Sequence, residues 1–121
     1  KEGLTWYKDL EKAFTVSKTT GQPLFVDFTG YTCTNCRWME VNVFIEPEVK
    51  ERFKKMTLVQ LYTDAGPKHK ENQLYEIDRF GTAALPFYVI LTPEDEIIST
   101  FPGMTRKLDD FIDFLDSGLE G

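Results

Sequence analysis

Two cysteines separated by two residues, Cys33 and Cys36, are the side chains of this sequence best suited to chemistry. A thiolate is a strong nucleophile, and a cysteine at the start of a helix is stabilised as thiolate by free backbone N–H groups and by the helix dipole. The spacing places the second sulfur about one helical turn from the first, close enough for a disulfide. We therefore expect Cys33 to attack a disulfide of another molecule and Cys36 to resolve the mixed disulfide. The alternative is a pair of buried core thiols.

Two carboxylates stand near this pair. Asp27 lies six residues before Cys33 in an otherwise apolar run, where an ionised side chain is costly unless it has a task. Glu40 lies four residues after Cys36, on the helical face that carries both cysteines. Because negative charge disfavours a thiolate, we expect both acids to keep Cys33 less acidic than the helix start alone would, and Asp27 to relay a proton for Cys36. The alternatives are an Asp27 turned to the sheet edge and a solvated Glu40.

A third element is Pro86, which follows Leu85 directly ahead of the apolar run 87–91. This place suits a cis peptide bond, although an ordinary trans turn is the commoner outcome. Apolar surface beside a reactive atom can bind protein partners, so Leu85, Phe87 and Tyr31 are candidates for a substrate-binding collar around the sulfurs. In the alternative, Phe87 belongs to the core and Tyr31 is a loop aromatic.

The elements that position these residues follow from apolar periodicity and from glycine and proline. The patterns predict helices over 7–18, 33–43, 47–56, 74–80 and 108–115, and strands over 4–6, 24–28, 57–62, 87–91 and 97–101. The run 24–28 is nearly continuous in apolar residues, which is typical of a central strand covered on both faces. This order predicts an α/β sheet between two layers of helices, with the reaction site beyond the carboxyl ends of the strands.

Length and composition narrow the classes further. The 121 residues, 41% of them hydrophobic, suit one domain spanning 1–121. A net charge of −6 without a long cluster of Lys or Arg speaks against a nucleic-acid partner. A zinc site needs about four ligands, whereas the soft ligands here are Cys33, Cys36 and a single histidine, His69. We expect no metal and no cofactor other than the redox-active cysteine pair.

The stretches from Phe25 to Cys36 and from Phe80 to Phe87 together resemble the thioredoxin superfamily over nearly the whole chain. The resemblance implies a three-layer α/β sandwich with a central mixed sheet. It also implies that Cys33 attacks, that Cys36 resolves, that an acid at the place of Asp27 assists proton transfer, and that a cis-proline at Pro86 faces the disulfide and binds the substrate's extended backbone.

A narrower resemblance is carried by the stretch Asn-Cys-Arg-Trp-Met-Glu, from Asn35 to Glu40, together with Asp27 before it. This pattern resembles the C-terminal, periplasm-facing domain of the DsbD family. The members of that family are thiol:disulfide interchange proteins related to cytochrome c biogenesis. This resemblance implies a monomeric protein-disulfide reductase on the periplasmic side of the bacterial inner membrane. Electrons would arrive from a membrane-embedded domain and pass to a periplasmic partner. A start at Lys1, without an initiator methionine, fits a mature form or a piece of a longer membrane-anchored protein.

Departures from the thioredoxin pattern keep other functions open. Thr32 replaces the usual tryptophan, and Thr34-Asn35 replaces Gly-Pro, which argues against a general cytosolic thioredoxin. The competing interpretations are a free-standing periplasmic oxidoreductase or isomerase, and a peptide-binding module without redox turnover. A binding module should tolerate Cys33→Ser, whereas a reductase should lose turnover.

Overall fold

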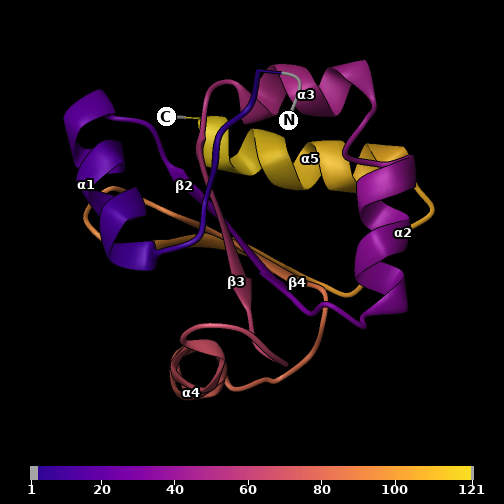
Figure 1. The fold of residues 1–121 in the computed structure, drawn as a ribbon. Helices are drawn as coiled ribbons and strands as arrows, with labels where there is room; N and C mark the ends of the chain where they lie inside the picture. Colours follow the sequence, from indigo (N-terminus) through magenta and orange to yellow (C-terminus); the bar gives the residue numbers. More distant parts are fainter. Residues whose placement is uncertain (1–2, 121) are drawn as a thin grey trace.

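The computed structural model describes residues 3–120, in which a mixed sheet lies between two layers of helices (Figure 1). The strands are β1 (Trp6–Tyr7), β2 (Leu24–Thr29), β3 (Thr57–Tyr62), β4 (Phe87–Leu91) and β5 (Ile97–Pro102). Their order across the sheet is β1-β3-β2-β4-β5. β1, β3 and β2 run parallel, and β4 runs antiparallel to both of its neighbours. The expected α/β class with a central mixed sheet is confirmed.

Helices cover both faces of this sheet. They are α1 (Leu10–Thr20), α2 (Thr34–Asn42), α3 (Pro47–Phe53), α4 (His69–Phe80) and α5 (Leu108–Leu119). α1 and α4 pack on one face, and α2, α3 and α5 pack on the other (Figure 1). The three-layer arrangement buries β2 from both sides, as its continuous apolar sequence predicts.

Alternation along β2 divides the core into two clusters. Phe25 points into the cluster under α2, α3 and α5, where its ring centroid lies 4.9 Å from that of Phe53 and 5.5 Å from that of Tyr88. Val26 and Phe28 point into the cluster under α1 and α4. Burial of each phenylalanine side chain of β2 contributes about 1.5–3 kcal/mol to the stability of the fold. The strand that precedes the cysteines is therefore held firmly in the middle of the sheet.

Some helices and strands begin or end at other residues than the sequence predicts. α1 begins at Leu10 rather than at residue 7, because the Asp9 carboxylate accepts a hydrogen bond from the Lys12 backbone N–H at 3.0 Å. α2 begins at Thr34, with Cys33 as its N-cap. The expected strand over 4–6 is Trp6–Tyr7, and α3 ends at Phe53 rather than reaching residue 56.

α4 turns a different face to the sheet from the one that its apolar residues predict. Leu74 and Ile77 are exposed, whereas Asn72 and Glu76 lie on the inner side. The Asn72 side-chain amide donates to the carbonyl oxygen of Tyr62 at 2.9 Å, which fixes the rotation of the helix. A carboxyl group therefore occupies a buried position that the sequence pattern assigns to solvent.

Candidate active site

Cys33 and Cys36 are joined by a disulfide at the beginning of α2, with their Cα atoms 5.3 Å apart. The Cys36 backbone N–H donates to the Cys33 Sγ at 3.1 Å. Cys36 is only 2% exposed, whereas Cys33 is partly exposed. Once the disulfide is reduced, the N–H groups of the first turn favour a thiolate at Cys33. The geometry gives one sulfur that a partner can reach and a second sulfur behind it.

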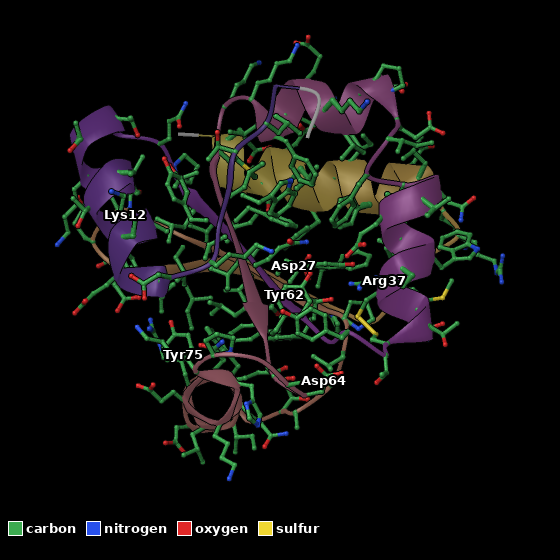
Figure 2. All side chains as sticks on the ribbon, in the orientation of Figure 1. Lys12, Asp27, Arg37, Tyr62, Asp64 and Tyr75 are labelled. Carbon is green, nitrogen blue, oxygen red and sulfur yellow. A yellow bond between two sulfur atoms is a disulfide. The ribbon has the colours of Figure 1, made fainter. Side chains whose placement is uncertain are left out.

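Asp27 lies in the middle of β2 and is buried, which excludes the interpretation that its carboxylate turns to the sheet edge (Figure 2). Its Oδ2 accepts a hydrogen bond from Nε2 of Gln60 at 3.2 Å, and its Oδ1 has no partner among residues 3–120. Burial raises the pKa of Asp27 to about 7, although the Gln60 hydrogen bond lowers it and the charge of Glu40 raises it further. A carboxyl with such a pKa can accept or release a proton near neutral pH.

Glu40 is 22% exposed and paired, so it is not an ordinary solvated glutamate. Nη2 of Arg37 donates to Glu40 Oε2 at 2.7 Å and to the Thr29 hydroxyl at 2.9 Å. The guanidinium thus links the end of β2 to α2 and sets a positive charge beside the negative one. Sequence reasoning missed Arg37, although its spacing of three residues from Glu40 is a recognisable helical ion-pair signal.

The turn before Cys33 is held by a residue that sequence reasoning also missed. The Asp64 carboxylate, just beyond β3, accepts hydrogen bonds from the backbone N–H groups of Tyr31 at 3.0 Å and Thr32 at 3.1 Å, and from the Thr32 hydroxyl. These bonds lower the pKa of Asp64. A Cβ at Gly30 would lie 2.9 Å from Oδ2 of Asp64 and 3.1 Å from a methyl carbon of Leu85, so glycine allows this close approach.

The Leu85–Pro86 peptide bond is cis, as the family resemblance implies. Because a Cβ at Gly30 would lie 3.1 Å from Leu85, this loop runs beside the turn that leads to the cysteines. Phe87 is buried in the cluster under α1 and α4, so its side chain offers no surface to a partner. Tyr31, by contrast, is 52% exposed and lies two residues before Cys33. Of the three residues proposed as a substrate-binding collar, Leu85 and Tyr31 are accessible. Phe87 belongs to the core, as the alternative interpretation has it.

Within residues 3–120, no group of three or more His, Cys, Asp or Glu side chains is arranged to hold a metal ion. None of the helices in the same residues combines the length and the apolar character needed to span a bilayer.

Three features together define a thioredoxin fold. They are a mixed sheet between two helical layers, a Cys-x-x-Cys disulfide at the start of the helix after the central strand, and a cis-proline before β4. The model of the thioredoxin-like family matches residues 5–93, and the chain belongs to this family. The fold and its cysteine pair support a thiol:disulfide oxidoreductase.

Solved structures agree with this assignment of the fold. A thioredoxin from Thermus thermophilus has a TM-score of 0.75 at 22% identity, covering 93% of this chain and 85% of that one. The oxidised C-terminal domain of DsbD from Neisseria meningitidis has a TM-score of 0.74 at 19% identity, covering 94% and 99%. The expected likeness to the thioredoxin superfamily, and to this DsbD domain in fold, is confirmed. A comparison with curated protein sequences finds no match.

Proposed function

We propose that the chain is a protein-disulfide reductase that relays electrons through Cys33 and Cys36 to partner proteins outside the cytoplasm. The observation that carries this proposal is the pairing of a reachable sulfur with a buried one at a helix start. The accessible thiolate can form a bond to a partner, and the buried thiol can release that partner. A structural disulfide in a core would need neither the accessibility of Cys33 nor the Cys36 N–H aimed at its sulfur.

The proposed reaction transfers two electrons by two exchanges of sulfur bonds. The Cys33 thiolate attacks a partner disulfide, forms a mixed disulfide and releases one partner sulfur as thiolate. Cys36 then loses its proton, attacks Sγ of Cys33 and releases the second partner sulfur. The protein ends as the Cys33–Cys36 disulfide, and the partner ends as a dithiol. A dithiol donor restores the reduced form by the reverse exchanges.

Asp27 is the proposed acceptor of the Cys36 proton. Its burial and its pKa of about 7 match a group that must change protonation state near neutral pH. Arg37, which pairs with Glu40, keeps the second carboxylate from adding its full negative charge to the site. The acids would restrain the reactivity of Cys33, and the arginine would set how strongly they do so.

The relay partners are proposed from the resemblance to the DsbD family. The likeness of the fold to the DsbD C-terminal domain supports a membrane-embedded dithiol as electron donor and a periplasmic disulfide protein as acceptor. We propose a monomeric domain on the periplasmic side of the inner membrane, with Leu85, Pro86 and Tyr31 contacting the partner. Leu85, which lies close to Gly30, and Tyr31, two residues before Cys33, offer accessible surface for this contact.

Two measurements test the function. The reduction potential of the cysteine couple should lie near −270 mV, roughly that of thioredoxin, whereas a value of roughly −120 mV would indicate an oxidase and reverse the proposed direction. The Cys36→Ser variant should accumulate a mixed disulfide with a protein substrate, and Cys33→Ser should not. If both single variants turn over like the wild type, the chain is not a reductase.

A further inference from the structure

A groove of about 360 Å³ lies beside the turn that carries the cysteines, on the side of β1 and the start of α4. Its lining includes Lys8, Asp9, Tyr31, Tyr62, Pro67 and Lys68, and we call it the tyrosine groove. Neither Leu85 nor Pro86 lines it, so Tyr31 is the one residue that it shares with the partner contact proposed above. Tyr31 connects it to the redox site, because this residue stands two positions before Cys33.

Two stacked aromatic rings form one wall of the tyrosine groove. The rings of Tyr31 and Tyr62 lie 4.1 Å apart at an angle of 20°. Asp64 fixes the backbone of Tyr31, and the ring of Tyr31 lies so close to Gly66 that a Cβ there would approach the phenol oxygen to 3.2 Å. Gly66 also has a φ of +87°, which favours glycine. The exposed ring is therefore held in place before any partner arrives, which limits the entropy lost on binding.

The charge of the groove is opposite to that of the chain. Nζ of Lys8 lies 4.8 Å above the ring of Tyr62. Nζ of Lys68 pairs with the Asp9 carboxylate at 3.0 Å. The lining thus carries two lysines and one aspartate, a net positive charge, in a protein whose net charge is −6. Complementary charge across an interface speeds association and selects the partner.

We propose that the tyrosine groove binds an acidic, extended segment of the protein whose disulfide Cys33 attacks, a few residues away from the partner's reacting cysteine. This inference rests on the proposed function and adds the chemistry of the partner. The backbone and apolar parts of the segment would lie on the tyrosine rings, and its carboxylates would approach Lys8. A second copy of this chain is disfavoured as occupant, because both copies carry the same negative net charge.

The test uses three disulfide peptides that differ only in the residues flanking one cysteine, which are acidic, amide or basic. Reduction rates are measured with the dithiol form of the wild type and of Lys8→Gln. We expect the acidic peptide to react about fivefold faster than the amide peptide at low salt, and this preference to shrink at high salt. Lys8→Gln should abolish the preference. Lys12→Gln is the matched control, because Lys12 is an exposed lysine outside the groove, and it should keep the preference (Figure 2).

The ratio between peptides is the readout, because the charge of Lys8 also acts on the pKa of Asp27 and can change all rates together. Equal rates for the three peptides with the wild type would overturn the groove proposal and leave the reductase proposal standing. Failure to reduce any peptide would instead contradict the proposed function. A dimer at micromolar concentration that Lys8→Gln dissociates would assign the groove to a second copy of the chain.

Discussion

Nε2 of Gln60 donates a hydrogen bond to Oδ2 of Asp27 across 3.2 Å, between two neighbouring strands and out of reach of solvent. The bond favours the ionised carboxylate, whereas burial favours the neutral acid. The two effects oppose each other, and burial is the larger. The protonation of the candidate base therefore depends on an uncharged neighbour contributed by another strand.

Replacing this neighbour should shift the pH dependence of the reaction. In Gln60→Leu the pKa of Asp27 rises above about 7, because the hydrogen bond that lowers it is lost. The buried carboxyl also loses its donor, at a cost of ~1–3 kcal/mol of folding free energy. Rapid-mixing kinetics of the resolving step against pH should show the ascending limb displaced to higher pH. An unchanged pH profile would mean that Asp27 does not take the Cys36 proton.

The acids should control the acidity of Cys33. Asp27→Asn and Glu40→Gln each remove a negative charge near the sulfur, so each should lower the pKa of Cys33. Arg37→Gln should act in the opposite direction, because it leaves Glu40 unpaired. Thiol titration by absorbance or alkylation rate reports the values. The idea fails when neither acid variant lowers the pKa.

Glu76 predicts an unusual dependence of stability on pH. This residue of α4 is fully buried, and neither carboxyl oxygen has a hydrogen-bond partner in residues 3–120. Burial raises its pKa to about 8. The folded state therefore holds a proton that the unfolded chain releases above its ordinary pKa of about 4.3. The contribution of Glu76 to the free energy of unfolding should be most favourable below pH about 4.3. It should then fall as the pH rises to about 8, by up to about 1.4 kcal/mol per pH unit.

Urea unfolding of Glu76→Gln tests this dependence. The amide cannot ionise, so the variant should lose this part of the slope and exceed the wild type in stability at pH 8, while the two remain close near pH 4. Asp27→Asn should remove a second, smaller part of the slope, between about pH 4 and about pH 7, for the same reason. Parallel stability curves for wild type and Glu76→Gln would show that the carboxyl is not buried in solution.

Asp64 should hold the redox turn in place. Asp64→Ala removes the acceptor for the Tyr31 and Thr32 backbone N–H groups and for the Thr32 hydroxyl. We expect these two amides to exchange hydrogen faster, the disulfide-exchange rate to fall and the global stability to change little, because Asp64 is exposed. Hydrogen exchange read by NMR checks the local effect. Asp64→Asn keeps an acceptor oxygen and should recover part of the rate.

The parts of the site that lie close together in the chain are predicted by local patterns. An apolar run bounded by turn residues predicted β2, a segment without glycine or proline predicted α2, and the spacing of Cys33 and Cys36 at their junction predicted the disulfide. These features depend on neighbours within one or two turns of chain, where periodicity and capping act. The ion pair of Arg37 with Glu40 belongs to the same class and was within reach of the same reasoning.

Contacts between side chains far apart in the chain depend instead on how the strands and helices pack. Gln60 reaches Asp27, and Asp64 reaches Tyr31, because parallel pairing of β2 with β3 in one register brings positions 33 residues apart together. The burial of Glu76 likewise depends on the rotation of α4, which the Asn72 side chain fixes at the end of β3. Register and helix rotation are set by packing across the whole sheet, so no local pattern in the chain specifies them.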